Sequence, residues 1–162
     1  MTTSENDMQT EKQLVVFDLA SAAYGVDIGA VREIIRMQNI TSVPRTPSFV
    51  EGVINLRGKV IPVVDIRKKF DLPIAEENEE TRIVVVDIGG QDIGVIVDAV
   101  TEVLRIAADS VEAPSTFIKT ADSNYLMGIA KVDDRLITLL DLERVLSDEE
   151  RIELQETSVE VH

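Results

Sequence analysis

An internal repeat is the feature that most limits what this chain can fold into. Residues 14–36 align without a gap on residues 83–105, and nine of the 23 aligned pairs are identical. Most of the other pairs exchange one apolar residue for another. Repeats of this kind mark copies of one supersecondary unit that pack against each other. We therefore expect the fold to be built twice from one pattern.

A second pair of matching blocks sets the expected domain limits. Residues 52–66 match residues 128–142, and the larger offset places seven extra residues in the second copy. The predicted organisation is a flexible N-terminus (1–12), a two-unit domain (13–147), and a C-terminal helix end with an acidic tail (148–162). Within the domain we expect a first barrel (13–70), an acidic linker (71–81) and a second barrel (82–147).

Each unit is predicted to be mostly β. Residues 14–17 and 83–86 are short apolar runs bounded by turn residues, which is typical of buried strands. Arg57-Gly58 connects two further runs as a two-residue hairpin turn, since Gly readily adopts positive φ. About five short strands per unit favour a small SH3-like barrel. The expected fold class is two tandem five-stranded SH3-like β-barrels with short helices.

Proline and apolar spacing refine this expectation. Pro62 predicts that its strand lies at a sheet edge or ends in a bulge, because proline donates no ladder hydrogen bond. A short helix is expected near 65–70. A longer C-terminal helix is expected over 142–155, with one apolar face made of Leu142, Val145, Leu146 and Ile152.

Composition excludes several classes of site. The chain has no cysteine, and its one histidine is the last residue, His162. Disulfides, thiolate nucleophiles, histidine-based triads and nearly all structural zinc sites are thereby excluded. A net charge of −14 would repel nucleic acid and anionic membranes. Because no signal peptide or membrane span is evident, we expect a cytoplasmic protein.

No residue pattern indicates catalysis, a metal site or a cofactor. The nearest match to a phosphate-binding loop, Gly52 to Val60, has the wrong glycine spacing and Val where a hydroxyl is required. Asp133 and Asp134 are adjacent at a turn and have no further oxygen ligands nearby in sequence. A small enzyme using paired carboxylates stays open, since sequence alone does not exclude such a pair.

Two ordered motifs resemble one known family. The first runs from Tyr24-Gly25-Val26-Asp27-Ile28 through Glu33-Ile34 to the Asn55-Leu56-Arg57-Gly58 block and Asp65. The second, in the other half, runs from Gly94 to Leu104. Together they closely resemble the CheW family of bacterial chemotaxis coupling proteins over roughly residues 12–147. The resemblance implies two SH3-like barrels and a non-enzymatic adaptor without cofactors.

The resemblance also implies two protein partners: the cytoplasmic tips of methyl-accepting chemoreceptors, and the CheW-like regulatory domain of a CheA-type histidine kinase. The first partner would bind as a helical hairpin between the barrels. Its expected contacts are Val31, Glu33, Ile34, Asn55, Leu56, Arg57, Val97, Val100 and Val103. From the residues alone, Glu33 and Arg57 are ordinary exposed polar groups. The resemblance implies instead that they pair beside the receptor site.

For the kinase, the family uses the barrel ends. The matching residues here are Ile40, Val43, Glu112 and Phe117. Glu112 stands where the family often has a basic residue. Residues 14–70 carry three excess positive charges and 81–146 five excess negative ones, which predicts attraction between opposite ends of two such molecules. A rival interpretation is a CheW-like fragment of a larger signalling protein.

Overall fold

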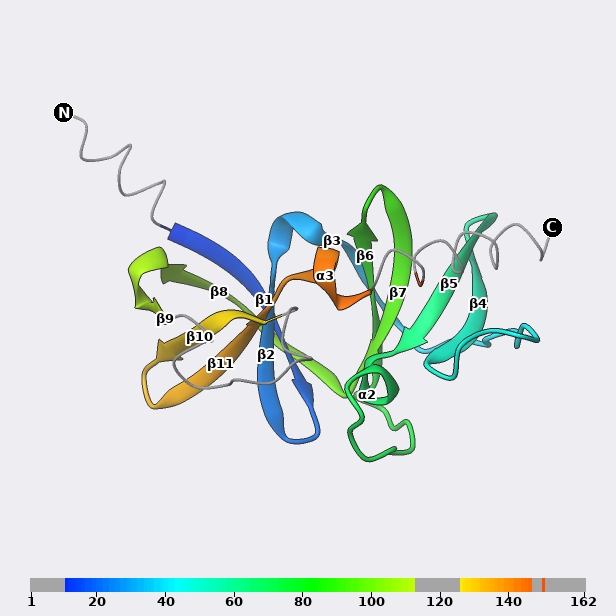
Figure 1. The fold of residues 1–162 in the computed structure, drawn as a ribbon, viewed down its shortest axis with the longest axis horizontal. Coiled ribbons are helices and arrows are strands. Elements are labelled where there is room, and N and C mark those ends of the chain that lie inside the picture. The colour runs from blue at the N-terminus through cyan, green and yellow to red at the C-terminus, as the bar shows by residue number, and fades with distance from the viewer. Residues whose placement is uncertain (1–10, 113–125, 147–149, 151–162) are drawn as a thin grey trace.

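The computed structural model describes residues 11–112, 126–146 and Glu150. Its strands form two sheets (Figure 1). Sheet A holds β1 (Glu11–Leu19), β2 (Ala22–Asp27), β8 (Ala99–Ala107), β9 (Val111–Glu112), β10 (Leu126–Val132) and β11 (Arg135–Leu140). Sheet B holds β3 (Val31–Arg36), β4 (Val50–Leu56), β5 (Lys59–Asp65), β6 (Arg82–Ile88) and β7 (Gln91–Val97). Helical turns are η1 (Ile28–Ala30), α2 (Ile66–Lys69), η2 (Ala108–Ser110) and α3 (Leu142–Val145).

The two repeat copies exchange their first hairpins. Sheet A has the order β8-β1-β2-β11-β10-β9, so it joins β1 and β2 of the first copy to the last strands of the second. Sheet B has the order β3-β6-β7-β5-β4 and joins β6 and β7 to the last strands of the first copy. The fold class is confirmed as mostly β with two SH3-like barrels, which we call barrel A and barrel B after their sheets.

The exchange corrects the expected barrel limits. Residues 13–70 and 82–147 were each predicted to form one barrel, but the strands of each range are divided between both sheets. Barrel B lies within residues 31–97, and barrel A takes its strands from both sides of that range. Sequence similarity identifies equivalent strands, whereas hydrogen bonding decides which strands share a sheet, and here β1 pairs with β8 and β3 with β6 across the two copies.

Strand register shows that the repeat is structural. In sheet B, Glu33 of β3 pairs with Val85 of β6, and in sheet A the equivalent Glu102 of β8 pairs with Val16 of β1. Both ladders have a bulge at the same place, one residue before the glutamate. The two pairs of strands are therefore equivalent residue by residue.

Each barrel closes where an incoming segment meets β4 or β10 at a glycine. Thr41 forms an isolated bridge to Val53 in barrel B, and β9 pairs with β10 in barrel A. A Cβ atom on Gly52 would lie 2.1 Å from the Thr41 carbonyl oxygen, and one on Gly128 would lie 2.6 Å from the Glu112 carbonyl oxygen. Only glycine permits so close a backbone approach.

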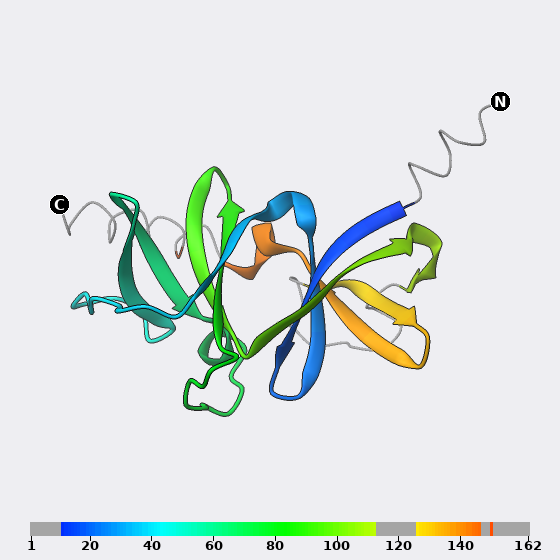
Figure 2. The same ribbon diagram turned by 180° about the vertical axis from the view of Figure 1, so that it is seen from behind.

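Three apolar clusters make up the described core. The largest lies between the barrels and takes side chains from β1 and β2 of sheet A, from β6 and β7 of sheet B, and from α2 and α3. Two smaller clusters fill the barrels, around Val16 and Ile137 in barrel A and around Ile61 and Ile83 in barrel B. Because the largest cluster is shared, the barrels pack as one unit (Figures 1 and 2).

Local expectations are partly confirmed. Arg57 and Gly58 form a tight turn with φ of 54° and 85°. Pro62 does not lie in an edge strand, since β5 pairs with β4 on one side and with β7 on the other. Its ladder with β7 begins one residue later, at Val63, so the missing N–H is tolerated.

The predicted C-terminal helix is interrupted at Leu146, although Glu150 is again helical. α3 ends at Val145, because Leu146 has an extended backbone (φ −110°, ψ 140°), so a continuous helix over 142–155 is wrong. Leu142, Val145 and Leu146 are buried as predicted, and Ile152 lies outside the described residues. Among the described helices, none has the length and apolar character needed to cross a membrane.

Candidate partner-binding surface

An apolar strip on β3 and β8 contains four of the predicted receptor contacts. Ile34 pairs with Val84 and its repeat equivalent Val103 pairs with Val15; both partners belong to the cluster between the barrels. Side chains of directly paired residues share one face of a sheet. Ile34 and Val103 therefore lie on the inter-barrel side, and they are 40% and 53% exposed.

Val31 and Val100 form the base of this strip. They are repeat equivalents, both half-buried, and both pack against the cluster between the barrels. The strip, defined as Val31, Ile34, Val100 and Val103, thus has a supported inner pair and an exposed outer pair. In Figure 2, β3 runs from the upper middle of the molecule toward barrel B, and β8 runs from the lower middle toward barrel A.

Val97 does not belong to this surface. It is 1% exposed in β7 and is part of the cluster between the barrels. A partner therefore cannot touch it without unpacking the core, which corrects its predicted role as a direct contact. Its repeat equivalent, Ile28, is 37% exposed. Alternation along the strand did not separate the two cases, because burial here depends on how the barrels pack.

Glu33 and Arg57 form the ion pair that the resemblance implied. Arg57 Nη1 donates to Glu33 Oε1 at 3.2 Å and Arg57 Nη2 donates to Glu33 Oε2. The pair joins β3 to the β4–β5 turn, where Asn55 Oδ1 accepts a hydrogen bond from Gly58 N at 2.8 Å. The hydrogen bond and charge of Glu33 raise the pKa of Arg57. Asn55 thus shapes the turn that presents Arg57, while Leu56 is half-buried against the core of barrel B.

A second set of ion pairs on barrel B was not predicted. Asp92 Oδ2 accepts from Lys59 Nζ at 2.8 Å and Asp92 Oδ1 from Arg32 Nε at 3.2 Å. Arg32 also donates to Asp87 at 3.1 Å. The Lys59 hydrogen bond, with the charges of both cations, outweighs burial and lowers the pKa of Asp92. We call these four residues the rim network. The members of the rim network are far apart in sequence, so no local sequence motif predicts their pairing.

Barrel A carries a simpler counterpart. Glu102, the repeat equivalent of Glu33, accepts a hydrogen bond from Arg135 Nη1 at 2.7 Å. The arginine lies two positions after the point equivalent to Arg57, which is Asp133 (φ 56°). The repeat alignment shows the matching glutamates but not that an arginine from a shifted position restores the pair.

The predicted kinase contacts are separate from the strip. Ile40 and Val43 are half-buried in the segment that leads from β3 to β4, in barrel B. Glu112 is exposed in β9, in barrel A. Phe117 lies outside the described residues. The two described groups of this set thus lie on different barrels, and their contact with a kinase stays a prediction.

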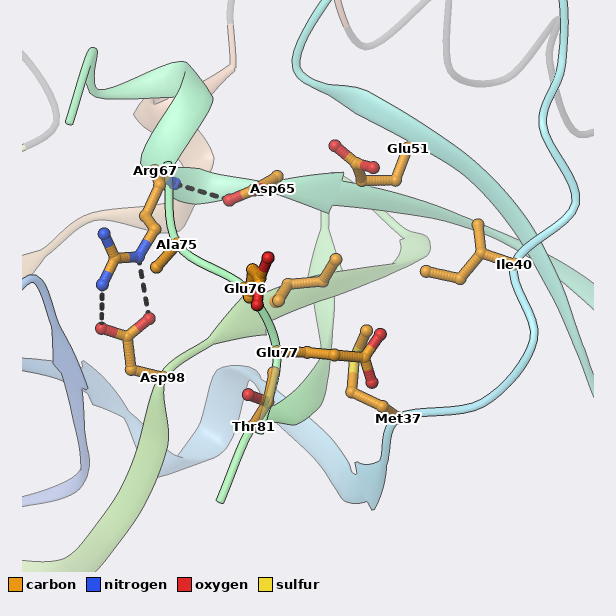
Figure 3. A pocket seen from close by; sticks show the side chains of 11 residues that line it. Met37, Ile40, Glu51, Asp65, Arg67, Ala75, Glu76, Glu77, Thr81 and Asp98 are labelled. Carbon is orange, nitrogen blue, oxygen red and sulfur yellow. Dashed lines mark hydrogen bonds and ion pairs between the residues drawn. The ribbon is translucent and has the colours of Figure 1, made fainter. Parts of the chain in front are cut away.

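A pocket of about 180 Å³ lies beside Ile40 (Figure 3). Met37, Ile40 and Ile96 supply apolar walls, and carboxylates of Glu51, Glu76 and Asp98 are among its acidic lining. Glu51 pairs with Lys68 at 2.5 Å and Asp98 with Arg67. Within the described ranges, no group of three or more acidic or histidine side chains is arranged to hold a metal ion.

Comparison with known proteins agrees with this geometry. Residues 13–150 match the CheW-like domain family model. A chemotaxis protein CheW from Helicobacter pylori is 35% identical over 143 residues, covering 88% of this chain and 86% of that protein. Another from Klebsiella aerogenes is 34% identical over 139 residues, covering 86% and 84%.

A solved structure shares the fold. The crystal structure of scaffolding protein TtCheW from Thermoanaerobacter tengcongensis superposes with a TM-score of 0.79 at 43% identity. The match covers 86% of this chain and 94% of that one. By these matches, and in keeping with the exchanged barrels and the Glu33–Arg57 pair, the chain belongs to the CheW-like family of chemotaxis scaffold proteins.

Proposed function

We propose that this protein is a non-enzymatic adaptor that couples methyl-accepting chemoreceptors to a CheA-type histidine kinase. The observation that carries the proposal is the apolar strip on β3 and β8. Its outer side chains, Ile34 and Val103, are large, apolar and about half exposed, although they stand on a well-packed base. An exposed apolar strip of this kind suits one face of an amphipathic helix.

A polar pair at the edge of barrel B would fix the position of that helix. Glu33 lies next to Ile34 in β3 but on the opposite face of the strand, because it pairs with Val85 of the barrel B cluster. Glu33 follows the bulge in β3 and is held by Arg57, which is itself 69% exposed. An exposed arginine beside an apolar contact is typical of residues that dominate binding energy. Because the pair is exposed, it contributes little to folding, so its value lies in recognition.

The kinase would bind at the barrel ends. Its regulatory domain is expected to have the same two-barrel plan, so barrel A of one molecule can meet barrel B of the other. Residues 31–97 without the linker 71–81, which hold barrel B, have nine basic and five acidic residues. The described residues on either side, 11–30, 98–112 and 126–146, have five basic and eleven acidic residues. Opposite charges of this size accelerate encounter between such ends.

The alternative hypothesis, that the protein is a small enzyme, predicts different ligands. A carboxylate-based enzyme would be stabilised by Mg²⁺ or a small substrate, whereas the adaptor is stabilised only by protein partners that bind the folded state. Thermal unfolding with and without Mg²⁺, and with receptor and kinase fragments, separates the two. We expect the unfolding temperature to rise with the receptor and kinase fragments and not with Mg²⁺. The adaptor would work in the cytoplasm, beside receptor arrays.

The decisive experiment compares two matched arginines. Arg57→Ala should lower receptor-dependent kinase autophosphorylation about tenfold, which corresponds to about 1.4 kcal/mol of binding. Arg135→Ala removes the equivalent pair from barrel A and should leave coupling unchanged. Both variants should unfold at the temperature of the parent protein, because both side chains are exposed. Full coupling by the Arg57 variant, or its global destabilisation, would refute the role given to Arg57.

A further inference from the structure

Asp98 stands at one of two places where the chain passes between the sheets. The first passage runs through η1, from β2 to β3, and the second is Asp98 itself, between β7 and β8. β8 begins at the next residue and carries Val100 and Val103. The direction in which the chain leaves Asp98 therefore sets where half of the apolar strip lies relative to barrel B.

Asp98 is held from both barrels at once. Arg67, from α2 beside barrel B, donates from Nε to Asp98 Oδ1 at 2.9 Å and from Nη2 to Oδ2, as Figure 3 shows. From barrel A, Ala20 N donates to Asp98 Oδ2 at 2.9 Å, and the backbone of Asp98 donates to the carbonyl oxygen of Asp18 at 3.0 Å. One carboxylate thus joins α2 to the β1–β2 turn.

The electrostatics favour an ionised, tightly held carboxylate. Burial opposes ionisation of Asp98 most strongly, yet the hydrogen bonds from Arg67 and Ala20 and the charge of Arg67 together lower its pKa. The Arg67 side chain is only 12% exposed, and it also bonds the carbonyl oxygen of Pro73 at 2.5 Å. Two-pronged bonds between arginine and carboxylate restrict geometry as well as adding energy.

The repeat-equivalent position is built differently. Gly29 stands where Asp98 would be, and it has no side chain to bridge the barrels. Glu143 of α3, the equivalent of Arg67, instead accepts a hydrogen bond from Gly89 N at 3.2 Å. This contact again joins a helical turn to the opposite hairpin turn. The two sides of the seam between the barrels are therefore unequal.

We propose that Asp98, through Arg67, is a positioning residue that fixes β8 against β3 and so sets the separation of the two halves of the apolar strip. The cluster between the barrels supplies most of their cohesion, but apolar packing has little directional preference. A charged, two-pronged bond has a defined geometry, so it can select one arrangement among several that bury similar area. The role in binding rests on the proposed function.

The absence of cysteine makes a direct measurement straightforward. Spin labels on Arg36→Cys and Arg105→Cys, exposed repeat equivalents near the ends of β3 and β8, report the distance between the two strands in the free protein. Asp98→Asn keeps the shape of the side chain but removes its charge. We expect it to shift or broaden the distance distribution. Glu143→Gln, at the equivalent place on the other side, is the control and should leave the distribution unchanged.

Binding, measured on the same substitutions without labels, completes the test. A receptor helical hairpin touches strands of both barrels, so Asp98→Asn should weaken its binding about tenfold. The kinase regulatory domain touches one barrel at a time and should bind as tightly as before. A Tm measurement accompanies both variants. Arg67→Lys, which keeps the charge but loses the planar fork, should reproduce the shifted distances and serves if Asp98→Asn does not fold.

The outcomes are separable. Distances in Asp98→Asn and Arg67→Lys that match the parent would overturn the positioning role. Altered distances with unchanged receptor affinity would overturn the role of that positioning in receptor binding. Failure of the parent protein to bind any receptor hairpin would instead refute the proposed function, while the distances would still decide whether Asp98 orients the barrels.

Discussion

Barrels A and B share one interior plan and differ at their rims. Both have the same bulge before a glutamate, and both close over a glycine that a backbone oxygen approaches. At the rim, barrel B has Glu33–Arg57 and the rim network, whereas barrel A has Glu102–Arg135 as the counterpart of the first pair and has alanine, Ala23, where Asp92 anchors the rim network. The two barrels therefore share the features that packing requires, whereas their exposed ion pairs differ because packing does not constrain them.

The closing glycines offer the strongest test of the shared interior. Gly52 has φ of +145° and would place a Cβ atom 2.1 Å from a backbone oxygen, so Gly52→Ala should lower the free energy of unfolding by roughly 3 kcal/mol or more. Gly128→Ala meets contacts at 2.6 Å without a positive φ and should cost about 1 to 3 kcal/mol. Urea denaturation measures both.

Gly58→Ala is the matched control for this experiment. Gly58 has φ of +85° but open space around its Cβ position. Gly58→Ala should therefore lower the free energy of unfolding by only roughly 1 kcal/mol, the cost of placing alanine at positive φ. Equal costs for Gly52 and Gly58 would mean that the close approach to Thr41 is not what demands glycine.

The equivalent positions Val97 and Ile28 test how burial differs between the copies. Val97 is 1% exposed and Ile28 is 37% exposed. Val97→Ala should cost about 2 kcal/mol, from two lost methyl groups and incomplete collapse around them. Ile28→Ala should cost less than about 1 kcal/mol. Thermal unfolding of the two variants measures the difference, and similar costs would contradict the assignment of Val97 to the core.

The rim network predicts a pH-dependent difference between the barrels. The folded state lowers the pKa of Asp92, so the resulting stability is present above the ordinary carboxylate pKa of about 3.9 and is lost as the pH falls through the lower folded value. Asp92→Asn should cost about 0.5 to 1 kcal/mol at pH 7, because its cationic partners are more than half exposed.

Urea denaturation at several pH values measures this effect. The difference between Asp92→Asn and the parent should disappear in acid, where both side chains are uncharged. Barrel A has Ala23 at the equivalent position, so no carboxylate there adds a pH-dependent contribution to stability. A difference that persists at pH 2 would show that shape, not charge, makes Asp92 useful.

The smallest expected effect concerns charge at the barrel ends. Association with the kinase regulatory domain should slow a few-fold between low salt and about 0.15 M, where charges are screened beyond roughly 8 Å. Dissociation should change little, because apolar contacts govern it. Surface-based kinetic measurements give both rates. Association that does not respond to salt would remove the basis for steering by opposite charges.

Sequence patterns predicted what local chemistry determines. The repeat, the Arg57-Gly58 turn and the β-rich character follow from residue types and spacing, and the Glu33–Arg57 pair from family resemblance. The division of strands between sheets did not follow, because a repeat reveals which strands are alike but not which of them pair. The buried state of Val97 and the rim network were missed for the same reason, since both depend on contacts between distant segments.

The exchange of hairpins also orders the events of synthesis. All five strands of barrel B lie within residues 31–97, whereas barrel A needs β1 and β2, which leave the ribosome first, and β8 to β11, which leave last. Barrel A therefore cannot be complete until residue 140 has emerged. Until then, β1 presents apolar residues on both faces, with Val15 bound for one cluster and Val16 for another. Its neighbour β2 waits longer still for its second partner, since Ala23 pairs with Ile137 of β11, and unpaired strand edges of this kind are what nascent-chain chaperones shield.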